Sequence, residues 1–147
     1  MAIQICKTNE FATIPIRGTD GAAGADLFAC IPEGSQQVKI PAGATVMIDT
    51  SIAMAIPRGN VGLVFPRSGW AIKKGLSLAN AVGVIDEDYR GTIKVGLHNH
   101  SKWEQTVSHN DRVAQIVIMP YIKPDFDLVE KLDETARGDG GFGSTGK

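Results

Sequence analysis

The sequence predicts an all-β fold, a jelly roll or closed β-barrel with one short helix, and three observations carry this prediction. Apolar and polar residues alternate from 46 to 56 and again from 93 to 97, which is the period of two of a half-buried strand. Residues 113–119 are almost continuously apolar and rich in β-branched side chains, as in a strand covered on both faces. Prolines and glycines interrupt such runs at short intervals and leave no room for long helices.

The individual elements can be placed in chain order. In the run from 46 to 56 the even positions are mostly apolar, while Asp49 and Ser51 occupy the odd face. The short helix is predicted from Ser68 to Lys73, opened by Ser68 and ended by Gly75. The strand at 113–119 follows, and Gln115 is its one polar residue.

The last part of the chain differs in composition from the rest. Residues 123–136 are charged and hold few apolar anchors, which predicts an extended C-terminal arm. We therefore expect a β-barrel at 1–122 and, at 123–147, an arm and glycine-rich lid of the same domain. With so few anchors the arm is not expected to fold back on its own barrel alone, and a neighbouring subunit could receive it; the sequence leaves both possibilities open.

Length and charge narrow the classes of partner. A chain of 147 residues suits one hydrophobic core, and its net charge of −1 argues against nucleic acid or membrane as a partner. Since no apolar stretch is long enough to span a bilayer and the N-terminus shows no signal pattern, we expect an intracellular location, cytoplasmic or nuclear. Cys6 and Cys30 are predicted to be buried thiols rather than a disulfide framework.

Residues 137–147 form a glycine-rich tail that retains Arg137, Phe142, Ser144 and Thr145. A glycine-dense segment loses too much entropy to order by itself, so we expect a ligand to order it. An arginine fork and hydroxyls bind phosphates, and a phenyl ring can cover a flat base. The tail therefore indicates a lid over a nucleotide, with a functionless flexible tail as the alternative. Its matches to dinucleotide and phosphate-loop spacings are chance, because both motifs need a following helix.

Three interior segments carry groups suited to nucleotide chemistry. Pro66–Gly69 places an arginine and backbone N–H groups at the start of a helix, where anions bind, although an ordinary strand exit has the same composition. Gly83–Gly91 is a tight acidic turn that offers a backbone edge to a base, Tyr89 to a sugar and Asp86 to a water. A solvated hairpin is its alternative. Asp26 is a carboxylate at the start of a strand, with a turn or cap as the alternative role.

Five segments occur in a recognisable order: residues 22–27, 66–69, 83–91 with Asn80 before them, 112–115, and 137–146. In this order and spacing the sequence resembles the trimeric dUTPase family, the deoxyuridine triphosphate nucleotidohydrolases. The resemblance implies a jelly-roll-like, distorted β-barrel, a homotrimer with shared active sites, and Mg²⁺ on the triphosphate. It also implies hydrolysis of dUTP to dUMP and pyrophosphate by metal-assisted attack of an Asp-oriented water on the α-phosphate. Such a reaction limits uracil in DNA and supplies dUMP for dTMP synthesis.

The resemblance assigns a role to each matching position. Asp86 would be the catalytic residue that holds the attacking water, and Asp26 would reach the metal through water. The nucleoside would be bound by Asn80, by the backbone of Gly83, Val84 and Ile85, by Tyr89 under the deoxyribose, and less specifically by Lys94. The phosphates would be bound by Arg67, Ser68, Gly69 and Gln115, and the tail would close over the nucleotide with Arg137, Phe142, Gly143 and Ser144.

Two other functions compete with this interpretation. A dCTP deaminase shares the fold but needs a glutamate base where this chain has Gly96, which has no side chain to move a proton. A non-catalytic module could bind nucleotide in the same pocket and signal through a partner. Trp70 and Ala25 depart from the residues usual in the family, and this bears on local packing rather than on activity.

Overall fold

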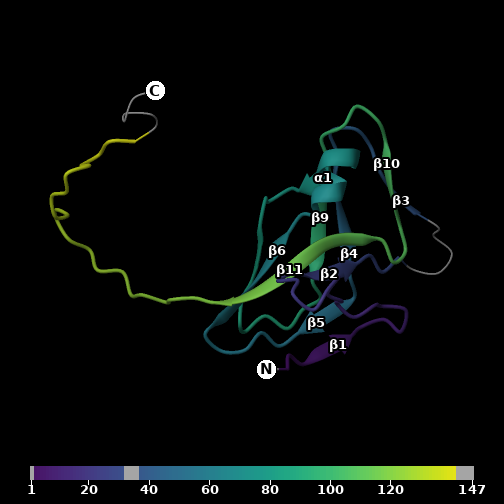
Figure 1. Cartoon of the computed structure of the whole chain (residues 1–147), viewed down its shortest axis with the longest axis horizontal. Helices are drawn as coiled ribbons and strands as arrows, with labels where there is room; N and C mark the ends of the chain where they lie inside the picture. The colour runs from purple at the N-terminus through teal and green to yellow at the C-terminus, as the bar shows by residue number, and fades with distance from the viewer. Residues whose placement is uncertain (1, 32–36, 142–147) are drawn as a thin grey trace.

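The computed structural model describes residues 2–31 and 37–141, and within these residues the chain is built almost entirely of short strands (Figure 1). The elements are β1 (Ile5–Lys7), β2 (Ala25–Phe28), β3 (Gln37–Ile40), β4 (Thr45–Asp49), β5 (Ile52–Met54), β6 (Asn60–Phe65), α1 (Ser68–Lys74), β7 (Leu76–Leu78), β8 (Gly83–Ile85), β9 (Lys94–Asn99), β10 (Gln105–Ser108) and β11 (Arg112–Pro120). The all-β prediction with one short helix is confirmed in this part of the chain.

All strand pairs are antiparallel, and the largest sheet has the order β2-β11-β6-β8. A second sheet has the order β4-β9-β7, and two further pairs join β1 to β5 and β3 to β10. Since neighbours in these sheets are often distant in sequence, the topology brings separate sequence segments together. Gln115 of β11, for example, lies opposite Asp26 of β2 on one side and Phe65 of β6 on the other.

The core lies between the sheets, where apolar side chains alternate inward. Val95 and Leu97 of β9 are buried as the period of two predicted, and so is Ile93 just before the strand. The predicted strand at 113–119 is part of β11, in which Val113, Ala114 and Ile116 are buried, while the side chains toward Pro120 are exposed. Its interior half is therefore covered as expected, and its outer half is not.

The run from 46 to 56 was expected to be one strand, and this prediction is wrong. It divides into β4 and β5 at Thr50 and Ser51, because Ser51 has a left-handed φ of 51° and its N–H binds the Asp49 carboxylate at 2.6 Å. The break sends β4 to pair with β9 and β5 to pair with β1. The sequence keeps apolar residues at positions 52, 54 and 56 beyond the break, but burial no longer alternates, because all three residues of β5 are buried.

Helix α1 extends one residue beyond the prediction and ends as expected at Gly75, which has a φ of 66°. Arg67, not Ser68, is the residue before the first turn, and no side chain caps it. Trp70, which departs from the residue usual in the family, packs partly against the core. The Lys74 ammonium lies 4.3 Å from the centre of its ring and makes a cation–π contact with it.

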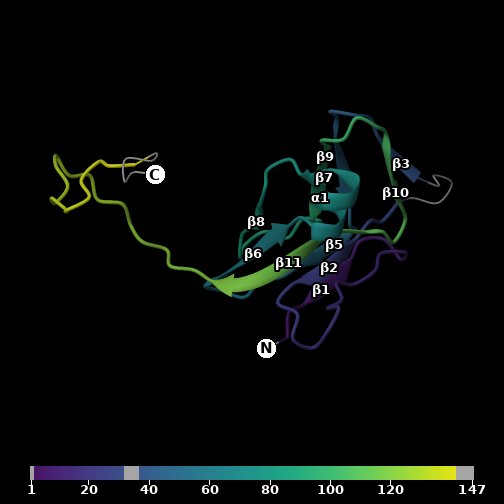
Figure 2. The same cartoon turned by 45° about the horizontal axis from the view of Figure 1, so that its top comes forward.

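The chain beyond β11 runs as an arm without regular structure through residue 141, and it leads away from the strands in both views (Figures 1 and 2). Phe126 and Leu128 are each 98% exposed. Within the described residues, no helix is long and apolar enough to cross a membrane. Cys30 is buried as predicted, but Cys6 is exposed on the short strand β1, which corrects the prediction of two buried thiols.

Candidate active site

One cluster of charged side chains is centred on Asp26. Its carboxylate lies 2.9 Å from Nε of Arg67, which follows β6, and 3.4 Å from an Nη atom of Arg112 at the start of β11. Only 14% of the Asp26 side chain is exposed. Two guanidinium groups around one carboxylate leave a local excess of positive charge, which suits an anionic ligand.

Gln115 completes this cluster from β11. Its Nε2 atom donates a hydrogen bond to the carbonyl of Pro66 at 3.1 Å, directly before Arg67. A Cβ atom on Gly24 would lie 2.5 Å from Gln115 Oε1, so the glycine provides the space that the amide needs. Three of the sequence segments singled out above, 22–27, 66–69 and 112–115, are thus joined around one site.

Ser68 and Gly69 lie at the first turn of α1, beside Arg67, and both are exposed. The N–H groups at the start of a helix have no acceptor within it. They are therefore free to bind an external acceptor next to the Asp26 cluster. The sequence placed these two residues with Arg67 as phosphate ligands, and the structure keeps the three together.

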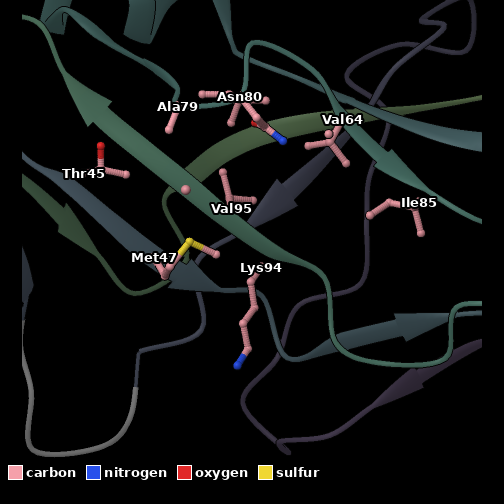
Figure 3. A pocket seen from close by; sticks show the side chains of 11 residues that line it. Thr45, Met47, Val64, Ala79, Asn80, Ile85, Lys94 and Val95 are labelled. Carbon is pink, nitrogen blue, oxygen red and sulfur yellow. The ribbon is translucent and has the colours of Figure 1, made fainter.

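A cavity of about 250 Å³ lies between β8 and β9, lined by residues from both large sheets. Asn80 and Ile85 lie on one side of it, Thr45 and Met47 lie on the other, and Lys94 is at its edge (Figure 3); Gly83 also lines it. Most of this lining is apolar. Since β8 is the outer strand of its sheet, one edge of its backbone is not used in the ladder. Val84 is 61% exposed and does not line this cavity, whereas the Ile85 side chain of the same strand does.

The turn after β8 forms a second cavity of about 310 Å³, which shares Met47, Ile85 and Lys94 with the first. Asp86 and Tyr89 line it. The Tyr89 hydroxyl donates to the carbonyl of Thr92 at 3.1 Å, and the Tyr89 N–H donates to the carbonyl of Asp86 at 3.2 Å. These bonds fix the Tyr89 ring and the backbone of Asp86 within one tight turn. The Lys94 ammonium faces the Asp49 carboxylate at 3.9 Å.

The Asp26 cluster and the two cavities are connected through β6. Phe65 of this strand lies opposite Gln115, and the preceding Val64 lies opposite Gly83. Among the described residues no side-chain hydrogen bond or ion pair joins the two groups. A single chain therefore presents a charged half and an apolar half that flank β6.

The described part of the tail, residues 137–141, makes no hydrogen bond to either half. Arg137 lies on the arm, where its Nε atom donates to the carbonyl of Gly140 at 2.8 Å. Phe142, Gly143 and Ser144 were also predicted to bind the nucleotide, and they lie outside the described residues.

Sequence reasoning missed three contributors to the two halves. Arg112 was noted only as part of a segment, and its pairing with Asp26 depends on the register of β11 against β2. Met47 and Thr45 occupy the outer face of β4 and gave no local signal, since exposed side chains on a half-buried strand are ordinary.

Comparisons with known proteins agree with this arrangement. A sequence model of the dUTPase family matches residues 10–146. A deoxyuridine 5′-triphosphate nucleotidohydrolase of Corynebacterium glutamicum is 46% identical over 99% of this chain and 95% of its own length. The protein of the same name from Debaryomyces hansenii is 43% identical over 99% of this chain and 88% of its own.

Solved structures show the same fold. A mutant dUTPase of phage 80α superposes with a TM-score of 0.87 at 26% identity, covering 97% of this chain and 98% of that one. A mutant dUTPase of phage φ11 of S. aureus, which reveals the coordination of a structural Mg(II) ion, has a TM-score of 0.78 at 25% identity and covers 89% of this chain and 98% of that one. The chain belongs to the dUTPase family. The predicted jelly-roll-like β fold and the predicted enzyme class, dUTP diphosphatase, are thereby confirmed.

Proposed function

We propose that the chain hydrolyses dUTP to dUMP and pyrophosphate by attack of a water molecule on the α-phosphate. The observation that supports this most directly is that the chain carries both an arginine-rich anion site and an apolar cavity with an open backbone edge. A charged triphosphate and a flat, hydrogen-bonding base require these two kinds of surface, and in a homotrimer each bound nucleotide would take them from different subunits.

The nucleoside occupies the cavities around β8. The free backbone edge of Gly83, Val84 and Ile85, together with the Asn80 amide, reads the uracil edge, because a backbone edge offers donors and acceptors in fixed order. Tyr89 packs under the deoxyribose, and Lys94 makes a less specific contact. Asp86 lies in the same turn as Tyr89, where its carboxylate orients the attacking water and accepts its proton.

The phosphates are bound by the charged half. Arg67 and the N–H groups of Ser68 and Gly69 bind phosphate oxygens, and Gln115 donates beside them. The tail then closes over the bound nucleotide with Arg137 and Ser144 on the distal phosphate, Phe142 on the base and Gly143 between them. In this proposal the chain is one domain, with a barrel at 1–122 and a functional arm at 123–147.

Mg²⁺ fits this site as a companion of the substrate. The described residues contain no group of three or more His, Cys, Asp or Glu side chains placed to hold a metal. Mg²⁺ is commonly held by one or two carboxylates plus substrate phosphates and keeps several waters, so Asp26 can hold it through water once the triphosphate is present. The ion would neutralise phosphate charge during the attack.

The active species is a homotrimer with shared sites. Support comes from the separation of the two halves in one chain and from the arm, whose exposed Phe126 and Leu128 side chains need another surface to cover them. In the cell the reaction limits uracil in DNA and supplies dUMP for dTMP synthesis. An intracellular location stays a prediction.

The deciding experiment measures pyrophosphate release from dUTP with Mg²⁺ for the native protein and for Asp86→Asn. We expect kcat of the variant to fall by about 10²–10⁴-fold with substrate binding retained, since Asn keeps the shape but does not accept a proton. Asp88→Asn, in the same turn, is the matched control. A kcat of Asp86→Asn within threefold of the native value would remove Asp86 from the mechanism. Ammonia release from dCTP would identify a deaminase, and nucleotide binding without turnover would identify a regulatory module.

A further inference from the structure

We propose that Glu87 is a positioning residue that holds the Asp86 turn in place and connects it, through Gly59, to the root of the C-terminal arm. The proposal deepens the function proposed above and rests on the role of Asp86 in it. It concerns residues outside the charged cluster and outside the two cavities that bind the nucleoside.

The side chain of Glu87 reaches out of its own turn. Its Oε2 atom accepts a hydrogen bond from the backbone N–H of Gly59, in the turn between β5 and β6. That turn is itself well defined, because the Asn60 amide donates to the carbonyls of Pro57 and Arg58 at 3.3 and 3.2 Å. Gly59 has a φ of 75°, a conformation that glycine adopts without cost. The acceptor therefore binds a backbone donor that has a fixed direction.

Glu87 is also held at its backbone. Its carbonyl accepts a hydrogen bond from Nη1 of Arg90 at 2.8 Å, within the same turn. The backbone of the residue that follows Asp86 is thus tied to the turn, while its side chain is tied to the barrel. Because Asp86 is bonded directly to Glu87, these two attachments restrict where the backbone of Asp86 can lie and thus where its carboxylate starts.

Gly59 contacts the arm as well. Its carbonyl accepts a hydrogen bond from the N–H of Tyr121, the first residue after β11, at 3.2 Å. A cavity of about 150 Å³ between these segments is lined by Val84, Asp86, Glu87 and Tyr121 together with two residues of β6. The point at which the arm leaves the barrel in Figures 1 and 2 is therefore next to the Asp86 turn of the same chain.

One residue, Gly59, thus receives both connections. The N–H of Gly59 binds the turn of Asp86, and its C=O binds the root of the arm. When an arm becomes ordered over a nucleotide, the direction of its root at Tyr121 is fixed. The hydrogen bonds of Gly59 to Tyr121 and Glu87 would then restrict the Asp86 turn of the same chain. If the arm closes on a neighbouring subunit, the link would connect two active sites.

The first test compares Glu87→Ala with Glu87→Gln and with Asp88→Ala, which removes a neighbouring carboxylate that has no such contact. We expect Glu87→Ala to lower kcat by about 10–100-fold with KM changed by less than about threefold, because a catalytic group displaced by about 1 Å can lose 10²-fold. Glu87→Gln keeps an oxygen acceptor and should recover most of the activity. A kcat of Glu87→Ala within threefold of the native value, or an equal loss in Asp88→Ala, would overturn the positioning role.

The second test does not depend on activity. Amide hydrogen exchange at Gly59 should become about tenfold faster or more in Glu87→Ala, as expected for the loss of a hydrogen bond to a charged group, and should stay slow in Asp88→Ala. Unchanged exchange would refute the contact, whatever the outcome for Asp86. Conversely, faster exchange together with an active Asp86→Asn enzyme would refute the role of Asp86 and leave the contact established.

The link to the arm is tested with Tyr121→Pro, which removes the N–H donor to Gly59. In the double variant, the loss of kcat should be smaller than the combined losses of Tyr121→Pro and Glu87→Ala, because each change alone breaks the same chain of contacts. Additive effects would overturn the connection between the arm and the turn.

Discussion

Gly91→Ala should disturb sugar selection through Tyr89 without altering Tyr89 itself. A Cβ atom on Gly91 would lie 2.6 Å from Cζ and 3.1 Å from Cε2 of the Tyr89 ring. Ordinary carbon contacts need about 3.5 Å or more, so the ring has to move by roughly 1 Å. Gly91 is not among the glycines with positive φ, and alanine therefore introduces no backbone strain.

The expected changes in stability and selectivity differ in size. Moving the ring weakens the hydrogen bond from its hydroxyl to Thr92, which costs about 0.5 kcal/mol because the side chain is partly exposed, or a Tm shift of about 1–2 °C. Selectivity against UTP depends on close contact between the ring and the sugar, so a displacement of this size should lower it by about tenfold. Rejection of dCTP, by about 10⁴–10⁵, should persist because the base-reading backbone is untouched.

The assay is kcat/KM for dUTP, UTP and dCTP in Gly91→Ala, in Tyr89→Ala and in Gly21→Ala, where an added Cβ meets nothing within 4 Å. Gly91→Ala and Tyr89→Ala should raise kcat/KM for UTP relative to that for dUTP, and Gly21→Ala should not. A UTP-to-dUTP ratio that stays within twofold of the native value in both Gly91→Ala and Tyr89→Ala would show that sugar selection lies elsewhere.

Two further predictions concern the arm and the assembly. Deleting residues 138–147 should leave Tm nearly unchanged but reduce turnover sharply, because the lid excludes water and completes the phosphate site; an unchanged kcat/KM would argue against a lid. Mixing Arg67→Ala chains with Asp86→Asn chains should restore part of the activity, because a shared site takes these residues from different subunits. Activity that fails to recover in fully exchanged mixed trimers would place each site within one chain.

Local sequence patterns predicted individual strands, the helix and its end well. They failed where pairing between distant strands determines how the chain is divided into elements. The strand β9 and the helix α1 follow from the period of two and from Gly75. The break at Ser51 was not predictable from alternation, because the pattern of apolar residues passes through it unchanged. It depends on the side chain of Asp49 binding the Ser51 N–H.

The candidate site likewise contains residues that local sequence patterns predicted and contacts that they could not predict. Gly83–Gly91 is contiguous, so the neighbourhood of Asp86 and Tyr89 could be read directly, but the segment is not a hairpin, because β8 pairs with β6 while β9 belongs to the other sheet. The partnership of Arg112 with Asp26 arises from strand register between β11 and β2, and no local pattern encodes such a register. The same holds for the contact of Glu87 with Gly59, which joins two turns that are distant in sequence.

The charge arrangement around Asp26 bears on how a triphosphate enters. In the chain alone, Asp26 is bound to Arg67 and Arg112, so the guanidinium proposed as a phosphate ligand already has a carboxylate partner. An arginine has five donors in a planar fork, and one bond through Nε leaves the Nη groups of Arg67 free for phosphate oxygens. The Asp26 carboxylate therefore orients the Arg67 guanidinium and leaves its Nη donors for phosphate. It also holds the Arg67 and Arg112 guanidinium groups close together despite their mutual repulsion. Asp26 thus has a role in the charged half that is separate from the proposed contact with a metal ion, and this explains why a nearly buried carboxylate stands in the proposed anion site.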